Sequence, residues 1–460
     1  MPEHRLWAPR AWIDSCWQEG ALLGIDSQGH WSQVQTGVAA PPPHTRVLPG
    51  PVLPGLVNAH SHAFQRAFAG LSERRDSDAD DFWSWRDRMY RVAQRITAPQ
   101  MQAVAAHLYV ELLRGGYTQV CDFHYLHHGP HGQPMADRAT LCHALADAAA
   151  EAGIGLTVLP VLYERAGFTQ PVLREDQRRF ASTPTLVHQL MRDMQALARP
   201  RLNAGVAIHS LRAASPSAIS ELRWLVGDED VPIHMHVAEQ TQEVQDCLAA
   251  TGRRPIDWLC QEFAPDARWQ LVHATHTIRA EIDALAATGA GIVVCPGTEG
   301  NLGDGFCSLA DWLRASVPLS IGSDSHVTRN WPEELRWLEY GQRLQLRQRN
   351  VAASPQQQPA SAARLWNAAL SAGGRAAGQS LWGIMPGARA DALVMDTGTP
   401  ALVGIPPSHL LDALVFAGAE PQWREVLVGG EVVLRDGRHA QQEAITARFR
   451  SVMESLWHEA

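Results

Sequence analysis

Short runs of apolar residues alternate with longer amphipathic segments through the middle of the chain. Near-continuous apolar runs separated by stretches such as PQMQAVAAHLYVELLRGG are typical of parallel β-strands that are covered by helices. Eight such repeats predict an α/β fold, a (β/α)8 TIM-like barrel. The eight runs are residues 51–59, 118–125, 153–164, 202–210, 231–239, 268–276, 289–297 and 317–326.

Both chain ends have the short apolar runs and turn residues of β-structure. A proline-rich stretch closes the first end, and GG and DG turns divide the last one, where residues 424–440 predict a hairpin. We expect a small β-sandwich domain built from residues 1–54 and 386–440. The metal-dependent barrel of residues 55–385 is then inserted between them, and residues 441–460 form a C-terminal helix.

Length and composition agree with a globular protein that has a sizeable core. The 460 residues are 45% hydrophobic, which is enough for a barrel plus a smaller domain. The net charge of -9 argues against nucleic acid as a partner. No apolar run is long enough for a signal peptide or a membrane span. The seven cysteines include no CxxC pair, so we expect neither disulfides nor a thiolate metal site, and a cytoplasmic location.

Histidines and carboxylates occur where the apolar runs end. The C-terminal ends of barrel strands meet at one rim, where active sites of this fold are built, so these residues should lie together. They are His60 and His62 just after the first run, His124 and Tyr125 at the end of the second, His209 of the fourth, His236 and Glu239 of the fifth, His273 and His276 of the sixth, and Asp324 and His326 of the eighth.

Four of these residues predict a metal site. His60 and His62 are two positions apart on a strand and therefore share a face, so they can bind one ion together with His236 and Asp324. Three imidazoles and one carboxylate suit one Zn²⁺ per chain, although iron or manganese also fits. Such an ion lowers the pKa of a bound water toward ~7. A lone histidine at a strand end is more often structural; that interpretation is favoured for His276, and both stay open for His326.

The same pattern resembles the amidohydrolase superfamily. Many members hold two metals with a carbamylated lysine after the fourth strand, but this chain contains no lysine, so that bridge is impossible. The HVAE segment instead resembles the mononuclear deaminase branch. The resemblance implies that Glu239 shuttles protons, that His273 holds the attacked centre, and that Asp324 both binds metal and accepts a proton from the water.

Five motifs narrow the resemblance to the formimidoylglutamate deiminase family over essentially the whole chain. That family implies hydrolysis of N-formimino-L-glutamate to N-formyl-L-glutamate and ammonia in histidine degradation, and a homodimer. It also implies Gln65, Arg86, Tyr125, His209 and Arg212 as substrate contacts. The motifs are HAFQRA, FWSWRDRMY (82–90), DFHYLHH (122–128), IHSLRA (208–213) and CPGTEGNLGDG (295–305).

Arginines suit such a substrate, because a guanidinium binds each of two carboxylates through a bidentate pair of hydrogen bonds. Plainer interpretations stay open: Arg86 pairs with Asp87 or Asp81 on the surface, and Gln65 merely begins a helix. The nearest alternative function is deamination of a nucleobase, nucleoside or pterin ring, which favours aromatic walls over two arginines. A non-catalytic barrel is disfavoured, since every metal ligand and the proton-shuttling acid are present.

Overall fold

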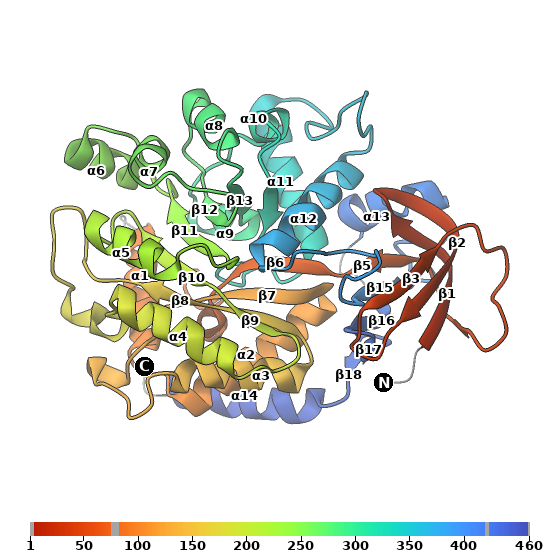
Figure 1. The fold of residues 1–460 in the computed structure, drawn as a ribbon, viewed down its shortest axis with the longest axis horizontal. Helices are drawn as coiled ribbons and strands as arrows, with labels where there is room; N and C mark the ends of the chain where they lie inside the picture. The colour runs from red at the N-terminus through yellow and green to blue at the C-terminus, as the bar shows by residue number, and fades with distance from the viewer. Residues whose placement is uncertain (1–3, 75–81, 419–422, 459–460) are drawn as a thin grey trace.

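The computed structural model describes residues 4–74, 82–418 and 423–458, with the side chains of residues 82 and 83 left aside, and contains a parallel barrel beside a mixed sheet (Figure 1). The barrel strands follow the order β14-β13-β12-β11-β10-β8-β7-β6, and each of the eight predicted runs overlaps one of them. The predicted fold class is therefore confirmed. The strands are β6 (Leu56–Ser61), β7 (Tyr117–His124), β8 (Gly155–Leu162), β10 (Val206–Ser210), β11 (Ile233–Val237), β12 (Trp269–His273), β13 (Gly291–Val294) and β14 (Leu319–Ile321), with β9 (Leu202–Ala204) paired to β8.

The barrel closes between its first and last strands at the residues predicted to bind metal. Ser61 and Asp324 form a parallel bridge. The backbone N–H of Asp324 donates to the carbonyl of His60 at 3.0 Å, and the N–H of His62 donates to the carbonyl of Asp324 at 3.3 Å. Closure of the barrel and placement of three predicted ligands therefore depend on the same hydrogen bonds.

Helices surround the barrel, and their ends follow from local sequence. In α2 (Ala98–Arg114), Thr97 and Gln100 form a capping box at the first turn, and ten of the side chains are buried. Within the described ranges, no helix is long and apolar enough to cross a bilayer. The other helices are α1 (Phe82–Ala93), α3 (Thr140–Ala152), α4 (Pro184–Ala196), α5 (Pro216–Val226), α6 (Thr241–Thr251), α7 (Pro255–Phe263), α8 (Arg279–Ala286), α9 (Pro296–Leu302), α10 (Leu309–Arg314), α11 (Trp331–Leu346), α12 (Ser361–Ala376), α13 (Leu410–Phe416) and α14 (Gln442–Trp457), with the 3-10 turns η1 (Ala63–Ala67), η2 (Pro130–Gly132), η3 (Glu175–Phe180) and η4 (Pro407–His409).

The two chain ends form one mixed sheet of nine strands, which makes up the small domain predicted from both ends. Figure 1 shows the first strands, in red, beside the last ones, in blue. Strand β5 (Val52–Pro54) joins the ends, because it pairs with β1 (His4–Ile13) on one side and β15 (Ala392–Met395) on the other. The sheet has its own buried core, which includes Leu23 and Leu427. Its other strands are β2 (Cys16–Ile25), β3 (Trp31–Gln35), β4 (Arg46–Val47), β16 (Trp423–Val428), β17 (Glu431–Arg435) and β18 (Arg438–His439).

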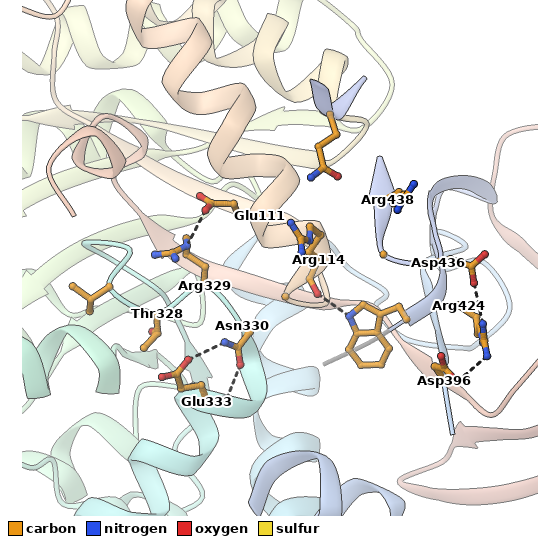
Figure 2. A pocket seen from close by; sticks show the side chains of 15 residues that line it. Glu111, Arg114, Thr328, Arg329, Asn330, Glu333, Asp396, Arg424, Asp436 and Arg438 are labelled. Carbon is orange, nitrogen blue, oxygen red and sulfur yellow. Dashed lines mark hydrogen bonds and ion pairs between the residues drawn. The ribbon is translucent and has the colours of Figure 1, made fainter. Parts of the chain in front are cut away.

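A hollow between the barrel and the chain-end sheet is lined mainly by paired charges (Figure 2). Glu111 on α2 pairs with Arg329 at 3.4 Å, and Arg424 on β16 pairs with Asp396 at 3.1 Å and with Asp436 at 3.2 Å. The indole N–H of Trp423 crosses the junction and donates to the carbonyl of Arg114 at 3.0 Å. None of the predicted metal ligands lines this hollow, so it is a junction between the two parts.

Trp423 is expected to be a main anchor of that junction. Its side chain is 2% exposed and its ring stacks on Trp331 with centroids 6.2 Å apart. Replacing Trp423 by alanine should lower the free energy of unfolding by about 3–5 kcal/mol, because a large cavity opens and a hydrogen bond is lost. Urea unfolding followed by circular dichroism measures this change. Trp224→Ala, at a 78% exposed position, is the control and should change it by less than about 0.5 kcal/mol; equal losses would contradict the assignment.

Candidate active site

The four predicted metal ligands converge on one point inside the barrel rim. The Nε2 atoms of His60 and His236 are 3.0 Å apart. Oδ1 of Asp324 lies 3.4 Å from Nε2 of His60 and 3.2 Å from Nε2 of His62. All four side chains are buried. Four donor atoms from β6, β11 and the segment after β14 are therefore directed at the same small volume.

Hydrogen bonds fix the histidines in the form that binds a metal. Nδ1 of His62 donates to the carbonyl of Phe123, and Nδ1 of His236 donates to the carbonyl of His209, both at 2.9 Å. Each Nε2 therefore keeps its lone pair directed at the common point. Burial lowers the pKa of His60 to about 3 and that of His236 well below its usual value, so both rings are neutral at pH 7. This donor set fits a divalent metal ion such as zinc.

The backbone is strained where these strands end. His273 and Asp324 have φ angles of 70° and 47°, and Ala238, between His236 and Glu239, has a φ of 50°. Residues other than glycine rarely adopt this left-handed region, which costs on the order of 1–3 kcal/mol each. The barrel fold tolerates this cost, and in return the side chains turn inward over the strand ends.

A buried chain of acids and one histidine adjoins the ligands. Nε2 of His273 lies 3.7 Å from Oε1 of Glu239 and 3.8 Å from Oδ2 of Asp324, and its Nδ1 donates to Oε1 of Glu299 at 3.3 Å. Burial opposes the cation, but Glu239, Glu299 and Asp324 together raise the pKa of His273 to about 10. Burial raises the pKa of Glu239 to about 7, where a carboxyl group can both accept and release a proton at neutral pH.

The five predicted substrate contacts line one cavity over the metal ligands. Gln65, Arg86, Tyr125, His209 and Arg212 border it together with Glu239, His273 and Asp324. The amide nitrogen of Gln65 donates to the Tyr125 hydroxyl at 3.0 Å. Its buried amide oxygen has no hydrogen-bond partner among the described residues, so an acceptor is left at the cavity wall. The structure thus brings the five residues together, and their roles stay predictions.

The contacts of Arg86 and His326 agree to different degrees with the non-catalytic interpretations of these residues. Arg86 approaches Asp87 only at 3.8 Å while lining the cavity, and Asp81 lies outside the described residues. His326 is fully buried below the rim, with Nδ1 3.0 Å from the Ser323 hydroxyl and Nε2 3.1 Å from the carbonyl of His62. Its two nitrogens therefore connect the segment after β14 to the residue after β6, which favours the structural interpretation.

His276 is half-buried, and it is absent from the described residues that line the cavity. Its backbone N–H donates to the carbonyl of Ala238 at 3.0 Å, and its own carbonyl accepts from Arg254 at 2.6 Å. These contacts agree with the structural interpretation that was favoured for it.

Two buried acids that support the site escaped the sequence argument. Asp122 accepts the backbone N–H of Ala63 at 3.1 Å behind the metal ligands, and burial raises its pKa to about 7. Glu299 accepts the backbone N–H of Cys295 at 2.9 Å as well as His273. Asp122 lies inside the second apolar run and Glu299 just after the seventh, both within motifs that carried the resemblance, DFHYLHH and CPGTEGNLGDG, and this position was the available signal.

Comparison with known proteins agrees with this geometry. A model of the amidohydrolase family matches residues 52–433. The solved structure of an amidohydrolase from Brucella melitensis superposes with a TM-score of 0.92 at 38% identity, covering 98% of this chain and 99% of that one. The chain therefore belongs to the amidohydrolase family, and it is a hydrolase that acts on C–N bonds.

The similarity is more specific within the family. Formimidoylglutamate deiminase of Pseudomonas aeruginosa is 43% identical over 452 residues, which cover 98% of this chain and 99% of the relative. A 5-methylthioadenosine/S-adenosylhomocysteine deaminase of Natronomonas pharaonis is 27% identical over 84% of this chain and 81% of that one. The resemblance predicted from the five motifs is confirmed, and the ring-deaminase alternative is not favoured.

Proposed function

We propose that this protein hydrolyses N-formimino-L-glutamate to N-formyl-L-glutamate and ammonia, a step of histidine degradation. The observation that carries the proposal is a single cavity that is lined both by metal-type donors with Glu239 and by two arginines, Arg86 and Arg212. Two guanidinium groups suit a linear substrate with two carboxylates. The similarity to formimidoylglutamate deiminase over nearly the whole chain supports the same substrate. The homodimer and the cytoplasmic location remain predictions.

The metal that we propose is one Zn²⁺ per chain, held by His60, His62, His236 and Asp324. Three neutral imidazoles and a carboxylate are typical zinc donors, and iron or manganese would use the same atoms. When bound, such an ion lowers the pKa of a coordinated water toward ~7 and so supplies hydroxide at neutral pH.

The protein's own groups move the protons of the reaction. Asp324 or Glu239 accepts the proton that the attacking water gives up. The formimino carbon then carries four substituents, and cationic His273 beside it stabilises the negative charge that develops there. Glu239 donates a proton to the nitrogen as its bond to carbon breaks. Ammonia leaves and the formyl carbonyl forms as the remaining O–H proton passes to Asp324 and then to the released ammonia, which returns both carboxyl groups to their starting state.

Gln65 is suited to the amidine rather than to a carboxylate. Its amide nitrogen is already used by Tyr125, so the group that it offers to the cavity is an oxygen acceptor. An acceptor binds the N–H groups of a formimino substituent and repels a carboxylate. Orientation of the substrate therefore follows, with the formimino nitrogen toward Gln65 and Glu239 and a carboxylate toward the arginines.

Ammonia release by the zinc-loaded protein tests this proposal. We expect turnover of N-formimino-L-glutamate and none of guanine, cytosine or adenosine. Arg212→Gln should lower kcat/KM by about 10–150-fold, because a charged hydrogen bond contributes about 1.5–3 kcal/mol. Arg349→Gln, at an exposed position, is the control and should leave kcat/KM unchanged. Turnover of a ring compound instead would overturn the substrate and keep the metal site.

A further inference from the structure

Two tyrosines, neither predicted from the sequence, line the same cavity as the two arginines. Tyr90 lies on α1 and Tyr163 directly follows β8. They are 5% and 1% exposed. The guanidinium carbon of Arg86 lies 5.5 Å from the centre of the Tyr90 ring. The phenol groups therefore lie next to Arg86 on the cavity wall.

Gln177, on η3, controls the hydrogen bonds of both phenols. Its side chain is 1% exposed, and its amide oxygen accepts the backbone N–H of Arg174 at 3.0 Å. This contact fixes which way the amide faces. Its amide nitrogen then donates to the hydroxyl of Tyr163 at 3.0 Å and to that of Tyr90 at 3.4 Å. Both phenol oxygens are thereby acceptors toward Gln177.

The hydrogens of the two phenol groups determine how many donors are available to a ligand. Each phenol accepts from Gln177 and keeps its own O–H hydrogen. The two phenol oxygens are 3.5 Å apart, so one hydrogen at most is shared between them. At least one O–H donor is then left for the cavity. Burial raises the pKa of Tyr163 far above its usual value, so this group stays a donor at every physiological pH.

We propose that Tyr90 and Tyr163, together with Arg86 and Arg212, bind one carboxylate of the substrate, and that Gln177 is a positioning residue that holds the phenols as donors. The inference deepens the proposed function and rests on it. A carboxylate has about four lone-pair sites and accepts from guanidinium and phenol donors at once. A carboxamide offers one oxygen and two N–H groups, and the N–H groups would face the arginines. The cluster thus selects the acid over its amide.

The test compares acid and amide substrates. We would measure kcat and KM of the zinc-loaded wild type, Tyr163→Phe and Tyr90→Phe on N-formimino-L-glutamate and on its two singly amidated forms. For the acid, we expect each variant to raise KM by about 2- to 12-fold, the range for one neutral hydrogen bond, with kcat little changed. The effect should vanish for the one amidated form that lacks the bound carboxylate. Tyr117→Phe, a fully buried tyrosine outside the cavity, is the matched control.

Gln177→Glu tests the positioning role separately. A carboxylate at that position accepts from both phenols, so it withdraws their hydrogens from the cavity and adds a negative charge. KM for the acid should rise by more than in either tyrosine variant, whereas Gln177→Asn should leave the zinc content intact and raise KM less. An unchanged KM in the tyrosine variants would overturn the proposal. An equal rise of KM on the acid and on both amides would overturn it too.

Failure of the proposed function has a different signature. In that case the wild type releases no ammonia from N-formimino-L-glutamate. Binding of glutarate, measured by calorimetry, then tests the carboxylate site without catalysis. Binding to the wild type that weakens in Tyr163→Phe would support the site, and equal affinity or no binding would reject it.

Discussion

A variant in which alanine replaces His236 is expected to lose both its bound metal and its activity. His236 supplies one of the four converging donors, with its Nε2 3.0 Å from that of His60. Loss of a group that only orients a ligand costs about 10–100-fold in metal affinity, so loss of the ligand itself should cost at least that much. Metal content by plasma mass spectrometry and ammonia release measure the two effects.

His234 provides a matched control for this variant. It lies on the same face of β11, two positions earlier, and is equally buried. Its Nε2 donates to the carbonyl of Ala376 at 2.8 Å instead of facing the metal ligands. His234→Asn should keep the metal stoichiometric, even if it lowers stability. A His236→Ala protein that retained full metal and full activity would refute the ligand assignment.

Replacement of Glu239 by glutamine should leave the metal bound and remove most of the catalysis. Glutamine has the same shape but can neither accept nor release a proton at neutral pH. General acid–base catalysis contributes about 10²–10⁴-fold, so kcat should fall by a factor in that range. Steady-state ammonia release gives kcat, and mass spectrometry of the intact metal complex confirms that the site is loaded.

The control for Glu239 is Glu262→Gln, at an exposed position on α7. It makes the same chemical change away from the cavity and should leave kcat unaltered. A Glu239→Gln protein within about three-fold of the wild-type rate would exclude Glu239 as the essential proton shuttle. His273 and Asp324, the other groups beside the reacting carbon, would then carry the proton transfers.

The sequence was sufficient to predict those features of the fold and of the site that depend on residue type and spacing. Alternation of apolar runs with helical segments requires a parallel sheet covered by helices, and eight repeats close it into a barrel. Polar residues at the strand ends must then share one rim. For that reason His60, His62, His236 and Asp324 could be predicted together from four separate segments, and the structure brings their donor atoms to one point.

Contacts through the backbone were beyond the reach of the sequence. The carbonyls of Phe123 and His209 orient His62 and His236, but every residue has a carbonyl, so these partners leave no mark in residue type. The strand order of the chain-end sheet could not be predicted for a similar reason. Pairing of β5 with both β1 and β15 depends on backbone register, which residue types do not record.

By itself, the sequence determined the barrel, the four residues whose donor atoms converge, the absence of a lysine bridge and the five further residues that line the cavity. Only the tertiary structure decided how these residues are supported. Gln177 meets Tyr90 across 87 positions of chain, and His326 reaches back 264 positions to His62. Such contacts depend on how η3 and the segment after β14 pack against distant strands. Packing of this kind arises from the shape of the whole core, which no local spacing of residues encodes.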